Sequence, residues 1–436
     1  MNWSQTFAPL RNRAFRYLVA GRTVSVLGNA VAPIALAFAV LDLTGSARDL
    51  GLVVGARSLA NVLFLLIGGV IADRFPRHLV MVGANLLAAG TQAAIAAAVL
   101  TGTATIPLLL GLSVVNGITA ALAQPATAAV IGQIVPQESR QQANALNRLG
   151  FASAAIFGAS LGGLLVAAIG PGWGLAVDAA AFAVAAGLFV MVRVPRASAA
   201  ERTGPAPNVF RELREGWVEF SSRTWLWAVV LGFCLLNAAY VGGVNVLGPV
   251  IADESFGRAG WGLVLAVKTV GMIVGALVAL RLRIRRFLFF GVACMAAPAL
   301  LLGGLALAPY LIVLVGAAFL TGLAMEQFGI AWETTMQEHV PGDKLARVYS
   351  YDMLGSFLAI PIGQVAVGPL AEALGTRVTM LGAAALVLIA VLGMLASRDV
   401  RRLEHRLDPP AVPVTADPVA GAPAAAADPG DLLTKS

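Results

Sequence analysis

Charged residues are scarce in this sequence: they make up 12% of its 436 residues, compared with about 25% in ordinary soluble domains. Hydrophobic residues make up 58%, and apolar stretches of about 20 residues, the length of a membrane-spanning helix, recur along most of the chain. Together these features exclude a string of water-soluble domains. The sequence therefore predicts an all-α protein that crosses a membrane many times.

Cysteine and lysine are also rare. The two cysteines, Cys234 and Cys294, lie in apolar runs, so they form neither a disulfide framework nor a zinc site, and we expect no metal and no cofactor. The three lysines follow valine, aspartate and threonine, so a Walker A loop cannot be written and ATP is excluded as an energy source. Positive residues lie in short clusters between apolar segments, which is typical of membrane topology signals and not of nucleic-acid binding.

Twelve apolar segments are long enough to cross a bilayer. They cover residues 17–41, 49–72, 79–100, 106–131, 143–168, 173–194, 224–250, 260–280, 287–307, 311–335, 346–371 and 377–397. Positive residues beside such spans are retained in the cytoplasm. With a cytoplasmic N-terminus, the external loops contain only Arg48, Arg258 and Arg377. We therefore expect both termini to be cytoplasmic.

The two halves of the chain form a direct repeat. Residues 51–57 (Gly-Leu-Val-Val-Gly-Ala-Arg) match residues 262–268 (Gly-Leu-Val-Leu-Ala-Val-Lys) at an offset of 262 − 51 = 211. Val135-Pro136 matches Val340-Pro341 at an offset of 340 − 135 = 205. Two parallel six-span halves are typical of transporters that alternate access around a central site. The expected parts are a first half (1–194), a cytoplasmic linker (195–223), a second half (224–407) and a disordered cytoplasmic tail (408–436).

The linker contains an amphipathic segment. Its apolar residues Phe210, Leu213, Trp217 and Phe220 are spaced so that all four share one helical face. This pattern favours a helix on the inner membrane surface, and a solvated linker helix is the alternative.

The segment after the second span carries a family motif, Gly68-Gly69-Val-Ile-Ala-Asp73-Arg74-Phe-Pro-Arg77. It resembles the loop 2–3 signature of the major facilitator superfamily. Further stretches resemble the drug and siderophore exporter branch, which includes macrolide-efflux-like and enterobactin-exporter-like proteins. These stretches are 56–58, 158–166, 176–182, 332–337 and 347–355. The resemblance implies a fold of twelve transmembrane helices and export across the bacterial cytoplasmic membrane.

One position departs from that resemblance. The antiporter signature of span five usually reads G-P-x-x-G-G, whereas residues 158–163 have Ala159 in place of the proline. Uptake of a small metabolite therefore stays an alternative to export, and a non-transporting membrane sensor is the alternative from another class. The same segment spells G-x-S-x-G, but Ser160 lies inside a predicted helix instead of a strand-to-helix turn, so we expect no hydrolase and no enzyme.

Ionisable residues inside spans indicate functional sites, because each is costly in hydrocarbon unless it faces a cavity or a partner. Glu326 is the acidic residue deepest in span ten, and a buried carboxyl can exchange protons near neutral pH, so we assign proton coupling to Glu326, with Glu333 as the second candidate. Arg57 and Lys268 are either cavity residues or structural cations. By resemblance, spans one, four, seven and ten line the cavity. The substrate-contacting candidates are Arg57, Lys268, Asn29, Asn116, Gln124, Asn237, Tyr240, Asn245, Gln327 and Trp332.

The cytoplasmic ends of the spans carry the candidate gate residues. A close-packed glycine lets helices slide, and an acid beside arginines can make and break charge-assisted bonds. The gate candidates are Gly69, Asp73, Arg74, Arg77, Arg148 and Asp352. The sequence thus predicts a monomeric secondary transporter in a lipid bilayer, which exports an amphipathic drug-like or siderophore-like small molecule in exchange for protons.

Overall fold

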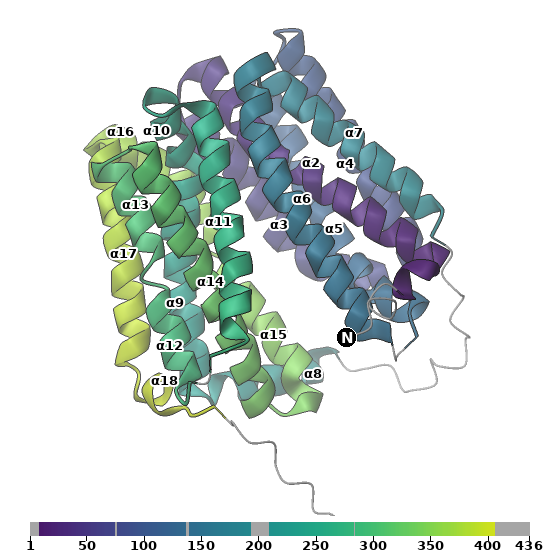
Figure 1. Ribbon diagram of the computed structural model, residues 1–436, viewed down its shortest axis with the longest axis vertical. Coiled ribbons are helices and arrows are strands. Elements are labelled where there is room, and N and C mark those ends of the chain that lie inside the picture. Colours follow the sequence, from purple (N-terminus) through teal and green to yellow (C-terminus); the bar gives the residue numbers. More distant parts are fainter. Residues whose placement is uncertain (1–7, 75, 137–138, 193–208, 283, 406–436) are drawn as a thin grey trace, which may run out of the picture. The chain divides into compact units, whose positions relative to one another are not determined.

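The computed structural model describes residues 8–74, 76–136, 139–192, 209–282 and 284–405, and every regular element in these ranges is helical (Figure 1). Eleven segments of this described part are long and apolar enough to cross a membrane. The twelfth, α3, carries Arg48, Asp49 and Arg57 in its first half. The predicted all-α fold is confirmed. The described helices belong to one compact unit, Met1–His405, and the predicted tail lies outside the described residues.

We group the helices by the two predicted halves of the chain and keep these names below. The N-terminal half consists of α2 (Arg13–Thr44), α3 (Ala47–Arg74), α4 (Arg77–Leu100), α5 (Ile106–Ile134), α6 (Arg140–Ile169) and α7 (Pro171–Val190). The C-terminal half consists of α9 (Thr224–Gly242) with η4 (Gly243–Leu247) and α10 (Gly248–Glu254), α11 (Gly257–Ala279), α12 (Phe287–Cys294), α13 (Pro298–Leu307), α14 (Leu311–His339), α15 (Gly342–Phe357), α16 (Ile360–Leu374) and α17 (Thr376–Ala396). The short elements η1 (Ala8–Arg11), α8 (Val209–Ser221) and α18 (Arg398–Arg402) flank them.

Three spans of the C-terminal half are interrupted, which the sequence analysis did not predict. Segment 287–307 divides into α12 and α13 before Pro298, and segment 346–371 divides into α15 and α16 before Pro361. The π-helical segment η4 interrupts the seventh span before Pro249. Proline has no N–H to donate and crowds the preceding helical turn, so each break follows from the proline.

The Val-Pro repeat marks matching helix ends. α5 continues to Ile134 and α14 continues to His339, each several residues beyond the predicted end of its span. Val135 and Val340 then take an extended backbone conformation, because the following proline disfavours helical geometry in the residue before it.

Large apolar side chains remain exposed on the outside of both halves. Leu164, Leu277 and Ile389 are 58%, 60% and 62% exposed, respectively. Monomeric soluble proteins rarely leave so much apolar surface uncovered, whereas lipid tails cover it without cost.

The two halves meet through a pair of matching contacts, between α3 and α16 and between α6 and α11; we call them the inter-half contacts. A Cβ atom on Gly262 of α11 would lie 2.7 Å from the carbonyl oxygen of Ala159 on α6. The same relation links Gly51 of α3 to the carbonyl oxygen of Gln364 on α16. Because Gly262 follows Gly51 by 211 residues and Gln364 follows Ala159 by 364 − 159 = 205, both contacts obey the sequence repeat.

A charged bridge also joins the halves. It lies at the end of the molecule that contains α10 and the last residues of α2, which we call the α10 end (Figure 1). The opposite end contains α8 and the first residues of α2. Arg258 of α11 donates to both carboxylate oxygens of Asp42 on α2, at 2.5 and 2.9 Å, and to Asp253 at 2.8 Å. Its guanidinium carbon also lies 4.8 Å from the centre of the Phe38 ring. The sequence analysis counted Arg258 only as a loop charge.

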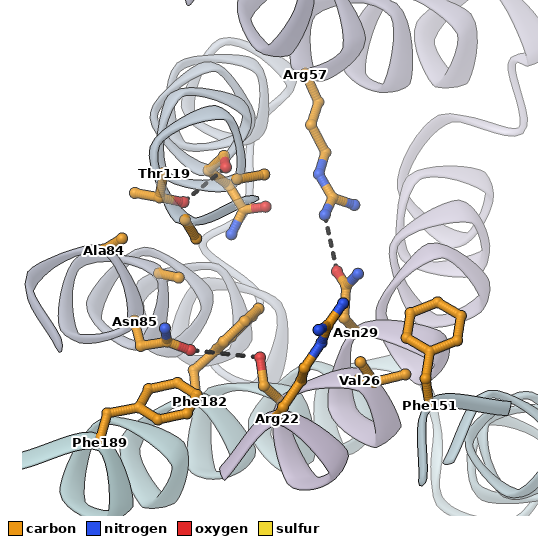
Figure 2. A pocket seen from close by; sticks show the side chains of 15 residues that line it. Arg22, Val26, Asn29, Arg57, Ala84, Asn85, Thr119, Phe151, Phe182 and Phe189 are labelled. Atoms are coloured by element: carbon orange, nitrogen blue, oxygen red, sulfur yellow. Dashed lines mark hydrogen bonds between the residues drawn. The ribbon is translucent and has the colours of Figure 1, made fainter. Parts of the chain in front are cut away.

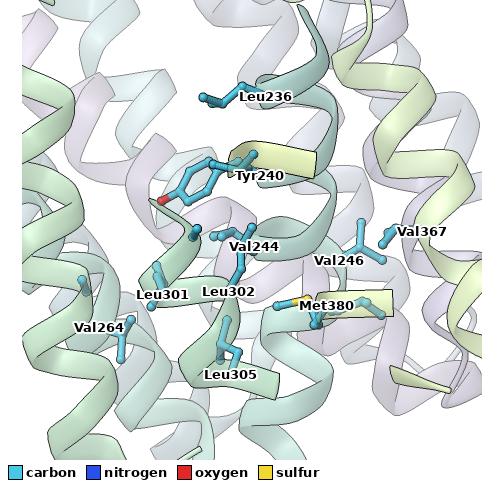
Figure 3. Close-up of a cluster of buried hydrophobic side chains, with 14 of the residues drawn as sticks. Leu236, Tyr240, Val244, Val246, Val264, Leu301, Leu302, Leu305, Val367 and Met380 are labelled. Carbon is cyan, nitrogen blue, oxygen red and sulfur yellow. The ribbon is translucent and has the colours of Figure 1, made fainter. Parts of the chain in front are cut away.

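The C-terminal half has a filled interior. Leu236, Val244 and Leu302 lie in one buried apolar cluster (Figure 3). Beside them runs a stack of aromatic rings, with 4.1 Å between the ring centres of Phe233 and Phe328 and 6.0 Å between those of Phe328 and Trp332. Such contacts favour tight packing around these side chains.

Candidate functional site

The N-terminal half contains a partly open cavity of about 500 Å³. Helices α2 to α7 all contribute to its wall, with polar side chains on α2 to α5 and aromatic ones on α6 and α7 (Figure 2). Its polar lining residues are Arg22, Ser25, Asn29, Arg57, Asn85, Asn116 and Thr119, and its aromatic ones are Phe151, Phe182 and Phe189. A cavity of this size with few polar groups on an apolar wall is suited to a drug-sized ligand.

Hydrogen bonds between helices fix several of these polar groups. Arg57 of α3 donates from Nη2 to Oδ1 of Asn29 on α2, at 2.9 Å. Ser25 donates to Oδ1 of Asn85 on α4, at 3.3 Å, and Asn85 donates in turn to the carbonyl oxygen of Met81. The side-chain nitrogen of Asn116 is buried without a hydrogen-bond partner in the described part of the chain. The wall is therefore ordered, with donor capacity to spare.

A buried carboxyl lies next to the cavity. Asp178 on α7 is fully buried, and Gln92 of α4 donates a hydrogen bond to its Oδ2 atom. Its Oδ1 atom has no hydrogen-bond partner among the described residues and lies against Gly28, where an added Cβ would be 2.8 Å away. The sequence analysis did not count this residue among the cavity candidates, because no pattern in the chain shows that α2, α4 and α7 meet there.

The predicted residues of the N-terminal half come together. Arg57, Asn29 and Asn116 all line the cavity. The side chain of Gln124 on α5 lies outside the described residues. Arg57 also borders a second, smaller pocket, which Asn245 lines as well.

Lys268 of α11 occupies the position that matches Arg57. Its Nζ atom lies 5.9 Å from the ring centre of Tyr240. Tyr240 follows Asn29 by 240 − 29 = 211 residues, so the pair of Lys268 and Tyr240 repeats the pair of Arg57 and Asn29. Arg57 is hydrogen-bonded to Asn29, whereas Lys268 lies over the ring of Tyr240. Of these two cations, Arg57 lines the large cavity.

The other polar predictions of the C-terminal half bind neighbouring helices. Asn237 donates to the Ser356 carbonyl oxygen at 2.9 Å, and Gln327 donates to the Gly275 carbonyl oxygen at 2.6 Å. Trp332 of α14 donates through its indole nitrogen to Asp352 of α15, at 3.0 Å. Ser356 also donates to Asp352, at 3.1 Å. These bonds tie α9 and α14 to α15, and α14 to α11.

The two predicted proton-coupling carboxyls lie on α14. Glu326 is half-buried, and its Cβ atom would be 3.0 Å from a Cβ placed on Gly275 of α11. Glu333 is exposed and accepts a hydrogen bond from Gln337. Neither residue lines the cavity of the N-terminal half.

Five of the six gate candidates lie on α3, α4 and α6. Gly69, Asp73 and Arg74 belong to the end of α3, Arg77 begins α4, and Arg148 lies in α6. Their side chains fall outside the described residues. Asp352, the remaining gate candidate, is bonded within the C-terminal half as described above.

The linker helix α8 rests on the C-terminal half. Glu219 forms ion pairs with Arg223 at 2.5 Å and with Lys344 at 2.9 Å. These two cations, Lys344 first, hold the pKa of the Glu219 carboxyl below its usual range. Phe220 is buried against Tyr351, whereas Trp217 is 53% exposed. The predicted apolar stripe therefore packs partly on protein; Phe210 and Leu213 lie outside the described side chains.

Sequence reasoning missed four polar residues of the cavity, which are Arg22, Ser25, Asn85 and Thr119. Arg22 was counted among the cytoplasmic topology charges, although it falls five residues inside the predicted first span. Its spacing from Ser25 and Asn29 is three and then four residues, which places all three on one helix face. That periodicity was a usable signal. Asn85 and Thr119 carried none, because polar residues occur on many faces of the spans.

Comparisons with known proteins place the chain in a family. A model described as transmembrane secretion effector matches residues 4–421. Macrolide efflux protein A of Streptococcus pyogenes is 23% identical over 89% of this chain and 97% of its own length. Enterobactin exporter EntS of Shigella flexneri is 30% identical over 61% of this chain and 62% of its own length, and the multidrug efflux pump Tap of Mycolicibacterium fortuitum is 26% identical over 86% and 91%.

Solved structures agree on the fold. A bacterial homolog of the human lysosomal transporter Spinster, in an inward-facing and unoccupied conformation, superposes with a TM-score of 0.71 at 17% identity, over 90% of this chain and 98% of that one. The nucleoside transporter NupG superposes with a TM-score of 0.68 at 14% identity, over 88% and 98%. The family model covers nearly the whole chain. The chain therefore belongs to the transmembrane secretion effector family of the major facilitator superfamily, and it is a multi-pass membrane transporter.

Proposed function

We propose that this chain is a proton-driven exporter of amphipathic small molecules in the bacterial cytoplasmic membrane. The observation that carries the proposal is the cavity of the N-terminal half, in which polar groups are held against aromatic rings inside otherwise apolar helices. The relatives named for macrolide efflux, enterobactin export and multidrug efflux support the direction and the substrate type.

Protons are the proposed energy source. One proton crossing a potential of 100 mV releases about 2.3 kcal/mol, which sustains a substrate ratio of roughly fifty. Glu326 is the proposed coupling residue, since it is half-buried on α14, and Glu333 is the exposed second candidate. The Asp73 segment, with Gly69, Arg74, Arg77, Arg148 and Asp352, is proposed to stabilise one state of a cytoplasmic gate.

Uptake of a small metabolite is the second candidate function. One observation favours it: Ala159 replaces the proline of the antiporter signature, and its carbonyl oxygen lies in an inter-half contact. A changed contact between the halves alters the balance between conformations and with it the coupling.

The deciding experiment is transport by purified protein in liposomes with an imposed pH gradient, tested against antibiotics, dyes and siderophores. Export predicts that an acidic lumen drives accumulation of substrate into vesicles that hold the protein with its cytoplasmic side outward. The same gradient would drive substrate out if the protein is a proton symporter. Absence of any pH-driven flux across the whole panel would contradict both forms of the proposal.

The proposed orientation has its own test. Both termini are expected in the cytoplasm, with α8 at the inner membrane surface, the four-part division of the chain retained and the protein acting as a monomer. Cysteines introduced beside Met1 and Ser436 should resist an impermeant thiol reagent in intact cells and react after permeabilisation. Labelling of either end in intact cells would overturn the orientation.

A further inference from the structure

The cavity of the N-terminal half presents two guanidinium groups. Figure 2 shows Arg22 on α2 and Arg57 on α3, both directed into the same space. Asn29 accepts one hydrogen bond from Arg57. Within the described part of the chain, no hydrogen bond or ion pair engages Arg22. Arginine offers five donors, so most of the donor capacity of this pair is available to a ligand.

The acidic groups around the cavity do not neutralise both arginines. No acidic residue is among the described residues that line it. The carboxyl of Asp178 lies behind Gly28, beside the cavity wall, and accepts a hydrogen bond from Gln92. Among the described residues, one carboxyl, that of Asp178, therefore lies beside two arginines. A partly closed site with an excess of positive charge is stabilised by an anion.

The sequence repeat supplies an internal control. Matching positions in the C-terminal half follow α2 by 211 residues, so Phe233 takes the place of Arg22 and Tyr240 that of Asn29. Phe233 stacks on Phe328 and helps to fill that half. The fold therefore does not require an arginine at this position. Because a charged side chain among membrane helices costs free energy, the presence of Arg22 points to a ligand that offsets this cost.

The rest of the wall limits the kind of anion. Phe151, Phe182 and Phe189 border the same space on the α6 and α7 side, and aromatic rings favour flat apolar groups. Resting on the proposed function of this cavity as the substrate site, we infer that it binds compounds with an aromatic body and an anionic group, and that Arg22 and Arg57 hold the anion.

The test uses three naphthalene probes of one shape and different charge: naphthalene-2-sulfonate, the neutral naphthalene-2-sulfonamide and 2-naphthyltrimethylammonium. Binding to the full-length protein in phosphatidylcholine nanodiscs is measured by calorimetric titration, with empty nanodiscs subtracted. The sulfonate should bind at least about tenfold more tightly than the sulfonamide, because a charge-assisted pair with arginine is stronger than a neutral one. The ammonium probe should bind most weakly.

Variants of Arg22 identify the site. Arg22→Gln should weaken sulfonate binding by about tenfold and leave sulfonamide binding within a few-fold. Arg22→Glu should reverse the preference, so that the ammonium probe binds better than the sulfonate. Arg16→Gln is the matched control, since Arg16 is exposed on the same helix outside the cavity. Equal affinities for all three probes, or a sulfonate preference that survives Arg22→Glu in a folded protein, would overturn the inference.

Two further measurements are needed. The first distinguishes an aromatic anion from a lipid as the ligand, and the second distinguishes failure of this inference from failure of the proposed function. Adding phosphatidylglycerol to the nanodiscs should leave sulfonate binding unchanged, and loss of binding would assign the site to an anionic lipid and refute the aromatic-anion class. If the sulfonate binds as expected but the liposome assay shows no pH-driven flux, only the proposed function fails. If a cationic dye is exported by the wild type and by Arg22→Gln alike, without sulfonate binding, only the inference fails.

Discussion

The inter-half contacts allow the balance between conformations to be changed by single methyl groups. In Gly262→Ala, the new Cβ would lie 2.7 Å from both the Ala159 carbonyl oxygen and the Gly163 Cα atom. Backbone atoms cannot move aside as a side-chain end can, so α11 and α6 must separate. Overpacking of this kind costs about 1–3 kcal/mol. If the cost falls on the state in which this contact is closed, its population drops about 5- to 150-fold relative to the alternative state.

Distances between spin labels would measure that shift. Labels at Leu43 on α2 and Glu254 on α10 are exposed and lie on opposite halves at the α10 end. We expect Gly262→Ala to add a longer distance to the distribution, and Gly51→Ala to do the same through the matching contact. Gly111→Ala is the control, because a Cβ there meets nothing within 4 Å and alanine favours a helix.

Two results would refute this reasoning. The first is an unchanged distance distribution in a Gly262→Ala protein that is as stable as Gly111→Ala, which would mean that the contact is not tight. The second is a loss of folded protein without any change in the distances, which would assign the glycine to folding and not to the conformational balance.

Three further predictions concern charges. Arg258→Gln should also populate the longer distance between the same labels, but less, because an exposed ion pair contributes only about 0.2–1 kcal/mol. High salt should reproduce this effect in the wild type. Lys344 and Arg223 lower the pKa of Glu219 in the folded state, so the docking of α8 should be fully stabilised above the ordinary glutamate pKa of about 4.3 and weaken as the pH falls below it. Hydrogen exchange of α8 should therefore be slower in the wild type than in Glu219→Gln, and this difference should disappear in acid. Glu326→Gln should abolish uphill pH-driven transport and retain exchange down a gradient, whereas Glu333→Gln should have a milder effect; full accumulation by Glu326→Gln would remove it as the coupling residue.

Much of the fold could be predicted because hydrocarbon imposes strict rules. A span must be long, apolar and helical, so length and composition locate the segments without knowledge of their neighbours. The repeat of residues 51–57 and 262–268 even indicated which positions correspond. What the pattern did not predict is the division of three C-terminal spans, although Pro298 and Pro361 were visible. Many membrane helices tolerate proline, as α2 does at Pro33, so its presence alone does not decide.

The site was harder to predict, because helix contacts decide which polar groups face a cavity. Arg57 and Asn29 line it, whereas Asn237 and Gln327, equally polar and in comparable spans, bond to neighbouring backbone. A polar residue in a membrane helix has both options, and sequence spacing does not separate them. Arg22 shows the opposite error, since its charge matched a topology signal and concealed its place in the cavity.

The inter-half contacts have a mechanical consequence. While both contacts are closed, the two halves keep a single degree of freedom relative to each other, which is rotation about the line that joins the contacts. These contacts are the ones at Gly51 and Gly262: Gly51 belongs to the N-terminal half, Gly262 belongs to the C-terminal half, and each contacts a helix of the other half. The bond from Arg258 to Asp42 is a third attachment, on α2 instead of α3 or α6, and it blocks that rotation while it lasts. While the two glycine contacts and the Arg258–Asp42 bond are all closed, the two halves do not rotate relative to each other.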